Sequence, residues 1–430
     1  MVYGYNELDI DFAALANSES NSAIAAIHKY VALLSPSKKN AYTGLFEGKN
    51  LIFITAEAFS AEVIDPELTP TLYRLANEGI RFADYYQPLW GGSTITGEYS
   101  NLTGLVAAGG TASMQEANQQ DMFLLIGKQL QSRGYFSAAY HNHSYTYYDR
   151  HITHLAIGYD TFTGMGNGLE AGVTEQWPES DLEMMEFTLG QYIDQQPFSV
   201  YYMTISGHCL YSTQGNSMSR KNYDKVADMD ASETIKSYYA AHLELEKSLQ
   251  YLVNALEKAG IADDTVIVLA TDHYPYGLEN STAWNNTKDY LAELYGYAYT
   301  DYFQRDHNAL IIWSGCLEDM DLTVDTPVYS LDILPTLSNL FGVDYDSRLL
   351  VGRDVLSDTE PLVLWPNFSW KTDKGQYDAT TGIFTPAEGV RVSEGYVEYI
   401  SAVVANKIAY SQSVAYKNYF NYVAAALKAE

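Results

Sequence analysis

The stretch LIFITA, residues 51–56, is a short apolar run rich in β-branched side chains, and it stops at Glu57. A run of this length and composition predicts a strand that is buried on both faces of a sheet. Four similar runs follow, separated by segments of helical periodicity: FSAAY (136–140), FSVYYMTIS (198–206), VIVLAT (266–271) and ALIIWS (309–314). Strands that alternate with helices predict an α/β fold with a mainly parallel central sheet and helices on both faces.

This alternation also defines the expected domain organisation. Residues 1–48 precede it and are predicted to form a polar N-terminal helical arm, whereas residues 49–345 form the main α/β domain. The alternation stops in the turn-rich stretch GVDYDSRLLVG (342–352). Residues 346–430 are therefore predicted to form a small α+β subdomain, which ends in an amphipathic helix over 413–428.

The composition limits the possible partners. The 430 residues include 25 Lys and Arg against 54 Asp and Glu, which gives a net charge of −29. Nucleic acid is disfavoured because a phosphate backbone requires a basic face, and docking to an anionic membrane through charge alone is disfavoured for the same reason. The two cysteines, Cys209 and Cys316, do not suggest a disulfide framework or a zinc ribbon.

Chemically active side chains stand at the ends of four predicted strands. Glu57 follows the first, His141 the second, His208 the third and the pair Asp272–His273 the fourth. The carboxyl ends of parallel strands meet at one edge of an open sheet, where ligands bind. A single carboxylate or histidine after a strand is usually a cap or a surface group, but four such endings together favour a site. Asp, Glu and His without thiolates suit a divalent ion such as Mn²⁺, Mg²⁺ or Zn²⁺.

A candidate nucleophile lies in WGGSTITGEYSNLTGL (90–105), which combines paired glycines with several hydroxyl side chains. Glycines permit a close backbone approach, and a hydroxyl at the start of a helix lies where backbone N–H groups favour phosphate. The alternative interpretation is a plain helix cap, with Thr94 four residues before Glu98.

Eight blocks of the chain resemble, in order, those of lipoteichoic acid synthases, which are sulfatase-like members of the alkaline phosphatase superfamily. The blocks are KNLIFITAEAF (49–59), TPTLYRLANEGIRFADYY (69–86), GGSTITGEYSNL (91–102), GYFSAAYHNHSYTYYDR (134–150), GYDTF (158–162), TISGH (204–208), DDTVIVLATDH (263–273) and SLDILPTLSNLFGV (330–343). The resemblance covers about residues 40 to 345 and continues more weakly to the final helix. It implies the sandwich fold of that superfamily.

The resemblance further implies a phosphoglycerol transferase. Such enzymes move glycerol phosphate from phosphatidylglycerol head groups to a glycerol-phosphate or glycolipid acceptor outside the cell, through a threonine nucleophile and one Mn²⁺-type ion. Matched residue by residue, the metal ligands are Glu57, Thr94, Asp272 and His273. Thr94 occupies the family's threonine position, which Ser93 and Thr96 miss.

The family's substrate-pocket residues match His141, Arg150 and His208. Tyr148 stands where the family has tryptophan, so the choice of head group stays open. Family members carry membrane-spanning helices before this domain, and we therefore expect an extracellular domain held at the cell membrane by a tether outside this chain.

Three alternatives remain open at this point. A sulfatase requires Cys or Ser in a C/S-x-P-x-R motif, and the segment around Thr94 has neither the proline nor the arginine. A phosphoethanolamine transferase or a phosphodiesterase could share the same fold and metal ligands. A catalytically inactive module that binds teichoic acid or glycolipid would be expected to lack one of the four ligands.

Overall fold

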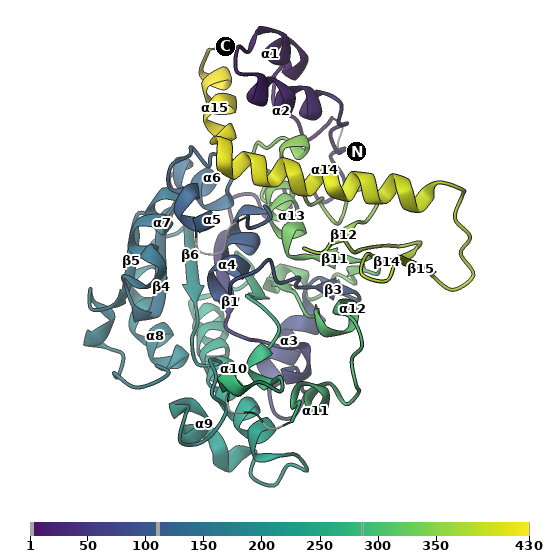
Figure 1. Ribbon diagram of the computed structural model, residues 1–430. Coiled ribbons are helices and arrows are strands. Elements are labelled where there is room, and N and C mark those ends of the chain that lie inside the picture. Colours follow the sequence, from purple (N-terminus) through teal and green to yellow (C-terminus); the bar gives the residue numbers. More distant parts are fainter. Residues whose placement is uncertain (1–3, 109–111, 285, 287, 430) are drawn as a thin grey trace.

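Six strands form the central sheet of the computed structural model, in the order β5–β4–β6–β1–β7–β9 (Figure 1). The structure describes residues 4–108, 112–284, 286 and 288–429. Of the six strands, β9 alone is antiparallel to its neighbour, so the predicted mainly parallel sheet is confirmed. The strands are β1 (Asn50–Ala56), β4 (Phe136–Ser144), β5 (Thr161–Met165), β6 (Phe198–Met203), β7 (Thr265–Thr271) and β9 (Ile311–Trp313).

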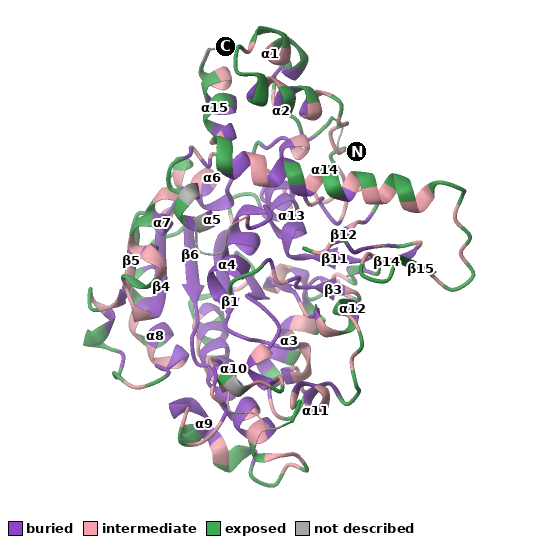
Figure 2. Cartoon of the chain, viewed as in Figure 1, coloured by how far each residue is buried: buried purple, intermediate pink, exposed green. Residues whose placement is uncertain are grey.

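Helices cover both faces of this sheet. Successive side chains of β1 point alternately into two separate hydrophobic cores, one on each face. Ile52 and Ile54 pack in one core, and Leu51 and Phe53 pack in the other. Because both faces are covered, β1 is buried along its whole length (Figure 2). The first core includes α3 (Pro70–Glu78), α8 (Asp181–Thr188) and α10 (Glu233–Ala259), and the second includes α4 (Thr94–Thr103), α6 (Ile126–Ser132) and α13 (Ile333–Leu340).

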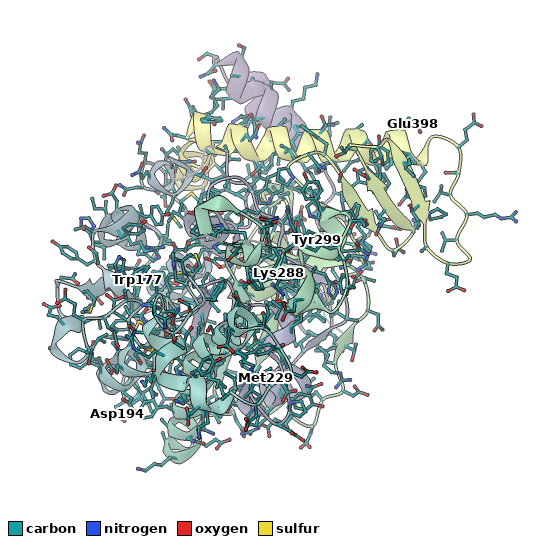
Figure 3. The ribbon with its side chains drawn as sticks, turned by 60° about the horizontal axis from the view of Figure 1, so that its bottom comes forward. Trp177, Asp194, Met229, Lys288, Tyr299 and Glu398 are labelled. Carbon is teal, nitrogen blue, oxygen red and sulfur yellow. The ribbon has the colours of Figure 1, made fainter. Side chains whose placement is uncertain are left out.

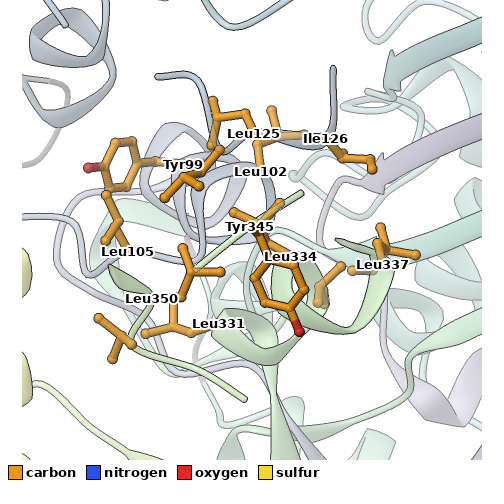
Figure 4. Packing of buried hydrophobic residues seen from close by; sticks show 14 of the residues in the cluster. Tyr99, Leu102, Leu105, Leu125, Ile126, Leu331, Leu334, Leu337, Tyr345 and Leu350 are labelled. Atoms are coloured by element: carbon orange, nitrogen blue, oxygen red, sulfur yellow. The ribbon is translucent and has the colours of Figure 1, made fainter. Parts of the chain in front are cut away.

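The second core fixes α4, the helix that carries the candidate nucleophile. Tyr99 and Leu102 of α4 belong to the same cluster as Leu334 and Leu337 of α13 (Figure 4). Shorter elements complete the main domain. They are α5 (Ala112–Ala117), α7 (Arg150–Ala156), α9 (Ser217–Asn222), α11 (Leu291–Tyr295), α12 (Tyr302–Arg305), β2 (Arg81–Phe82), β3 (Tyr85–Tyr86), β8 (His307–Asn308), β10 (Thr323–Val324) and β11 (Val328–Tyr329).

The C-terminal region combines an antiparallel sheet with two helices. The sheet contains β12 (Val363–Leu364), β13 (Trp370–Thr372), β14 (Gly375–Asp378) and β15 (Ile383–Pro386). The prediction of a single helix over 413–428 is wrong, because two helices share this stretch, α14 (Tyr396–Lys417) and α15 (Tyr419–Ala429). They are separated by Asn418, whose left-handed φ of 51° ends α14. The first half of α14 is only partly buried, and it therefore lacks the apolar periodicity that reveals a helix.

The N-terminal arm packs against these last helices. It consists of α1 (Phe12–Ser18) and α2 (Ser22–Ala32). His28 Nδ1 lies 2.9 Å from the hydroxyl of Tyr419, and the rings of Tyr30 and Tyr410 lie 5.3 Å apart. The two ends of the chain therefore share one part of the core (Figure 1).

Candidate active site

The carboxyl ends of β1 and β7 bring three of the predicted metal ligands together. Ala56 pairs with Thr271 across these parallel strands, so Glu57 and Asp272 follow at the same level. Glu57, Asp272 and His273 are all buried, and a ligand atom from each lies within 4.8 Å of the others. The side chains that the sequence places at strand ends thus converge in space.

The donor atoms of this cluster fit a divalent metal ion. His273 Nδ1 lies 2.8 Å from the carbonyl oxygen of Tyr274, which leaves Nε2 to face the carboxylates. Asp272 Oδ1 accepts hydrogen bonds from the backbone N–H groups of Ala58 and His273, both at 2.8 Å. Asp272 Oδ2 and His273 Nε2 are buried 3.1 Å from each other, and neither makes a hydrogen bond of normal geometry. Carboxylate oxygens and an imidazole nitrogen are ligands that such ions take.

The two carboxylates of the cluster, Glu57 and Asp272, favour a positive charge between them. Burial raises the pKa of Asp272 well above its ordinary value, and Glu57 adds to this rise. Burial alone would lower the pKa of His273, but Asp272 and Glu57 raise it to about 9. A metal ion between the carboxylates would take the place of the proton on His273.

Thr94 lies beside this cluster. It is the first residue of α4, and its Oγ1 donates to Glu57 Oε2 at 3.0 Å. Thr96 Oγ1 instead donates to the carbonyl oxygen of Ser93 at 2.8 Å, and Ser93 Oγ lies 3.0 Å from the hydroxyl of Tyr148. Of these three hydroxyl groups, the one that contacts the cluster is that of Thr94.

The interpretation of Thr94 as a plain helix cap is wrong. Ser93 occupies the N-cap position of α4 and makes no capping hydrogen bond with its side chain. Glu98, four residues after Thr94, accepts a hydrogen bond from Arg150. The hydroxyl of Thr94 is thus directed to Glu57, and the carboxylate of Glu98 is directed to Arg150.

Gly97 sets the distance between α4 and the metal-type cluster. A Cβ atom at this position would lie 1.7 Å from the backbone carbonyl oxygen of Asp272. The helix therefore packs directly on the backbone that carries a predicted ligand.

We expect Gly97→Ala to separate these elements, because neither backbone can yield easily. Urea unfolding should show a loss of about 3 kcal/mol or more, and the affinity for Mn²⁺ measured by calorimetry should fall. Gly190→Ala is the control, since a Cβ at Gly190 would meet nothing within 4 Å. An unchanged Mn²⁺ affinity in folded Gly97→Ala would contradict the expectation.

A pocket of about 110 Å³ opens beside Thr94. All four predicted substrate-binding residues line it, namely His141, Tyr148, Arg150 and His208. His143, Tyr147, Trp177 and Tyr276, which sequence reasoning missed, line it as well. The structure thus brings the predicted set together and adds a mainly aromatic rim.

Arg150 is held by a buried network that the sequence did not reveal. Its Nε donates to Glu98 Oε2 at 3.0 Å, and Glu98 also contacts His154 Nε2 at 3.1 Å and the hydroxyl of Tyr201 at 2.9 Å. Burial alone would raise the pKa of Glu98, but Arg150 and His154 lower it to about 2. Arg150 Nη2 is buried without a hydrogen-bond partner, and it can therefore hold an anionic oxygen.

Of the three histidines in the pocket lining, His141 and His208 both direct Nδ1 to a backbone carbonyl oxygen but differ in burial. His141 Nδ1 lies 2.9 Å from the carbonyl oxygen of Met203, and burial and the nearby Arg150 lower the pKa of His141 well below its ordinary value. His141 is therefore neutral, and its Nε2 is an acceptor. His208 Nδ1 lies 2.6 Å from the carbonyl oxygen of Cys209, and this side chain is only partly buried.

Aromatic residues shape the rim. Tyr148 has a left-handed backbone with φ 57°, and the guanidinium of Arg150 lies over its ring, 5.1 Å from the centroid. Trp177 is 42% exposed (Figure 3). Its ring packs edge-on against His208 and His143, with ring centroids 5.0 Å and 5.2 Å away. The left-handed backbone of Tyr148 persists only where its surroundings hold it, as is usual for a bulky residue. The position of Tyr148 beside Arg150 is consistent with a role in the rim of the pocket.

A parallel sheet that carries a carboxylate–histidine cluster and an adjoining hydroxyl at its carboxyl edge is typical of metal-dependent transferases and hydrolases. The chain belongs to the sulfatase family, whose sequence profile matches residues 49–343. The resemblance found in the sequence is thereby confirmed.

Lipoteichoic acid synthases are among the curated relatives. "Lipoteichoic acid synthase-like YvgJ" of Bacillus subtilis is 23% identical over 393 residues, which cover 88% of this chain and 61% of that protein. The lipoteichoic acid synthase of Staphylococcus saprophyticus is 26% identical over 81% of this chain and 54% of its own length. The chain thus spans little more than half the length of these relatives.

Solved structures share the fold. The lipoteichoic acid synthase LtaP from Listeria monocytogenes superposes with a TM-score of 0.72 at 20% identity, over 91% of this chain and 97% of that one. A protein of the alkaline phosphatase superfamily from Vibrio parahaemolyticus gives a TM-score of 0.64 at 16% identity, over 94% and 97% of the two chains. No helix in the described part of this chain has the length and apolar character needed to cross a bilayer.

Proposed function

We propose that the protein is a phosphoglycerol transferase that acts at the extracellular face of the membrane. It takes glycerol phosphate from phosphatidylglycerol-type head groups through a covalent intermediate on Thr94. The observation that carries this proposal is the 3.0 Å hydrogen bond from the Thr94 hydroxyl to Glu57, within the cluster of Asp272 and His273. The names of the curated relatives support the same substrate class.

Glu57, Thr94, Asp272 and His273 would hold one divalent metal ion, with Mn²⁺ as the proposed ion and Mg²⁺ or Zn²⁺ as alternatives. When bound, such an ion lowers the pKa of a coordinated hydroxyl and stabilises its alkoxide. Glu57 Oε2 already accepts the proton of the Thr94 hydroxyl as a hydrogen bond and orients the oxygen.

The transfer breaks one phosphate ester and forms another. Thr94 Oγ1 attacks phosphorus, and the bond to the diacylglycerol oxygen breaks. Arg150 Nη2 holds a phosphoryl oxygen, and we assign proton delivery to the leaving oxygen to His208. His141, which is neutral, accepts a hydrogen bond through Nε2 and therefore suits a glycerol hydroxyl rather than a phosphoryl oxygen. An acceptor hydroxyl then attacks phosphorus and gives its proton to His208, while the bond to Thr94 Oγ1 breaks and Thr94 regains the proton that it gave to Glu57 Oε2 in the first step.

The lining of the pocket favours glycerol over ethanolamine. Glu57 is the one carboxylate in that lining as the structure describes it, and it belongs to the predicted metal site. An ammonium head group would therefore lack a free carboxylate partner, whereas a glycerol hydroxyl finds His141. A threonine in place of the sulfatase Cys or Ser argues against a formylglycine mechanism.

The direct test is incubation of the protein with phosphatidylglycerol vesicles and Mn²⁺, followed by mass spectrometry of released diacylglycerol. We expect release from phosphatidylglycerol that stops on chelation with EDTA, and little release from phosphatidylethanolamine. Equal turnover of the two lipids would overturn the head-group assignment. Metal-independent turnover, or cleavage of an aryl sulfate instead of either lipid, would overturn the proposed mechanism.

A further inference from the structure

A second cavity, of about 560 Å³, lies beneath α14. It shares no lining residue with the active-site pocket of about 110 Å³. Figure 1 shows α14 passing over the C-terminal sheet, and the cavity lies between this helix and the segments 347–353 and 359–362. Sites for small organic ligands typically measure roughly 300–1,000 Å³. The cavity therefore has the size of a ligand site.

One face of α14 lines this cavity. Tyr396, Ile400, Val403 and Lys407 all line it, and they recur at the spacing of a helical face. The first fully buried residue of the helix is Val404. The first two turns of α14 thus border the cavity and pack only partly buried side chains against the core.

Lys407 places a cation in these surroundings without a matching anion. Its Nζ donates to the carbonyl oxygen of Val351 at 2.6 Å, and the structure places no carboxylate of the described chain within salt-bridge distance of it. Burial lowers the pKa of Lys407 to about 8, and Asp332 opposes this shift. The oxygens of Asp332 are already engaged by the backbone N–H groups of Tyr329 and Arg353, at 3.2 Å and 2.7 Å.

Arg353 adds a second cation to the lining. Its terminal nitrogens donate to the carbonyl oxygens of Val355 and Pro327 and to the hydroxyl of Thr326. Its Nε is buried without a hydrogen-bond partner. Of the other charged residues in the lining, Arg348 is paired with Asp346 and Lys374 with Glu360. Arg353 and Lys407 are therefore left with the carboxylate of Asp332, which gives the cavity excess positive charge in a protein with a net charge of −29. A buried or partly buried cation of this kind is stabilised by an anionic partner.

We propose that this cavity binds an amphiphilic anion, namely a single apolar chain that carries a carboxylate or phosphate head group. The head group lies at Lys407, and the chain follows α14 past Val403 and Ile400 toward Tyr396. The proposal does not depend on the activity proposed above, because the two cavities share no residue.

Calorimetric titration with decanoate, decyl phosphate and neutral 1-decanol, each below its aggregation limit, tests this site. We expect saturable binding of one anion per chain and at least tenfold weaker binding of the alcohol. The preferred anion distinguishes a carboxylate ligand from a phosphate ligand. Lys407→Met keeps the length of the side chain and should weaken anion binding at least tenfold. Val403→Trp should fill the cavity and abolish binding.

Lys417→Met is the matched control, because Lys417 is exposed at the end of the same helix. Absence of saturable anion binding by the wild-type protein would overturn the proposal. Equal affinities for the alcohol and the anions, equal effects of Lys407→Met and Lys417→Met, or full binding by Val403→Trp would do so too. If Lys407→Met does not fold, the comparison of anions with the alcohol on the wild-type protein decides the question.

Discussion

Thr94→Ala is expected to reduce diacylglycerol release from phosphatidylglycerol by about 10⁴-fold or more while the protein stays folded. The hydroxyl bonds to Glu57 and does not cap α4. Its loss should therefore remove the nucleophile and cost little stability. A simple capping role would instead predict a loss of about 1 kcal/mol and intact turnover. Release can be followed by mass spectrometry and stability by urea unfolding.

Two further measurements separate a nucleophile from a structural threonine. The peptide that contains Thr94 should carry glycerol phosphate in wild-type protein quenched during turnover, and should be unmodified in the alanine variant. Thr96→Ala is the matched control on the same helix, because its hydroxyl bonds to the carbonyl oxygen of Ser93. Substantial turnover by folded Thr94→Ala would defeat the proposed mechanism.

Substitution of Arg150 is expected to give the second large effect. The replacement residue decides how far stability and how far turnover is lost. Arg150 and Glu98 are 1% and 0% exposed and form a salt bridge at 3.0 Å. Arg150→Ala should therefore cost about 3–5 kcal/mol of stability, because Glu98 keeps a buried charge without its arginine. Turnover should fall as well, so a simple loss of activity without a loss of stability is not expected.

Arg150→Lys separates the two roles. Lysine keeps the charge beside Glu98 but lacks the planar fork that can bind Glu98 and a phosphoryl oxygen together. We expect most of the stability to return, while kcat/KM stays about 10²-fold below that of the wild type. Urea unfolding and diacylglycerol release measure the two quantities. If Arg150→Lys restores both, the free Nη2 has no role in turnover.

The main sheet and the strand-end residues could be predicted because their signals are local. LIFITA and VIVLAT are continuous apolar runs, and Glu57 and Asp272 follow them directly. The direction of β9 could not be predicted in the same way, because ALIIWS would look alike in a parallel or an antiparallel strand.

Other parts of the site depend on contacts between distant residues. Glu98 meets Arg150, His154 and Tyr201 across separations of 52, 56 and 103 residues, and no spacing in the sequence indicates such a network. Trp177 stands in the turn-like stretch QWPES, which has no periodic pattern. The roles of Thr94, Tyr148 and the other site residues remain predictions, although the structure brings these side chains together.

The packing of the N-terminal arm on the last helices has a consequence for biosynthesis. Phe12, Ile24 and Val31 share their core with Val414 and Tyr419. His28 of the arm and Tyr419 of α15 are 391 residues apart, so the arm is synthesised well before the helices that bury it. Its apolar face must therefore stay unpaired, or be shielded by a chaperone, until α14 and α15 have been synthesised. Folding of the arm thus waits for a segment that leaves the ribosome much later.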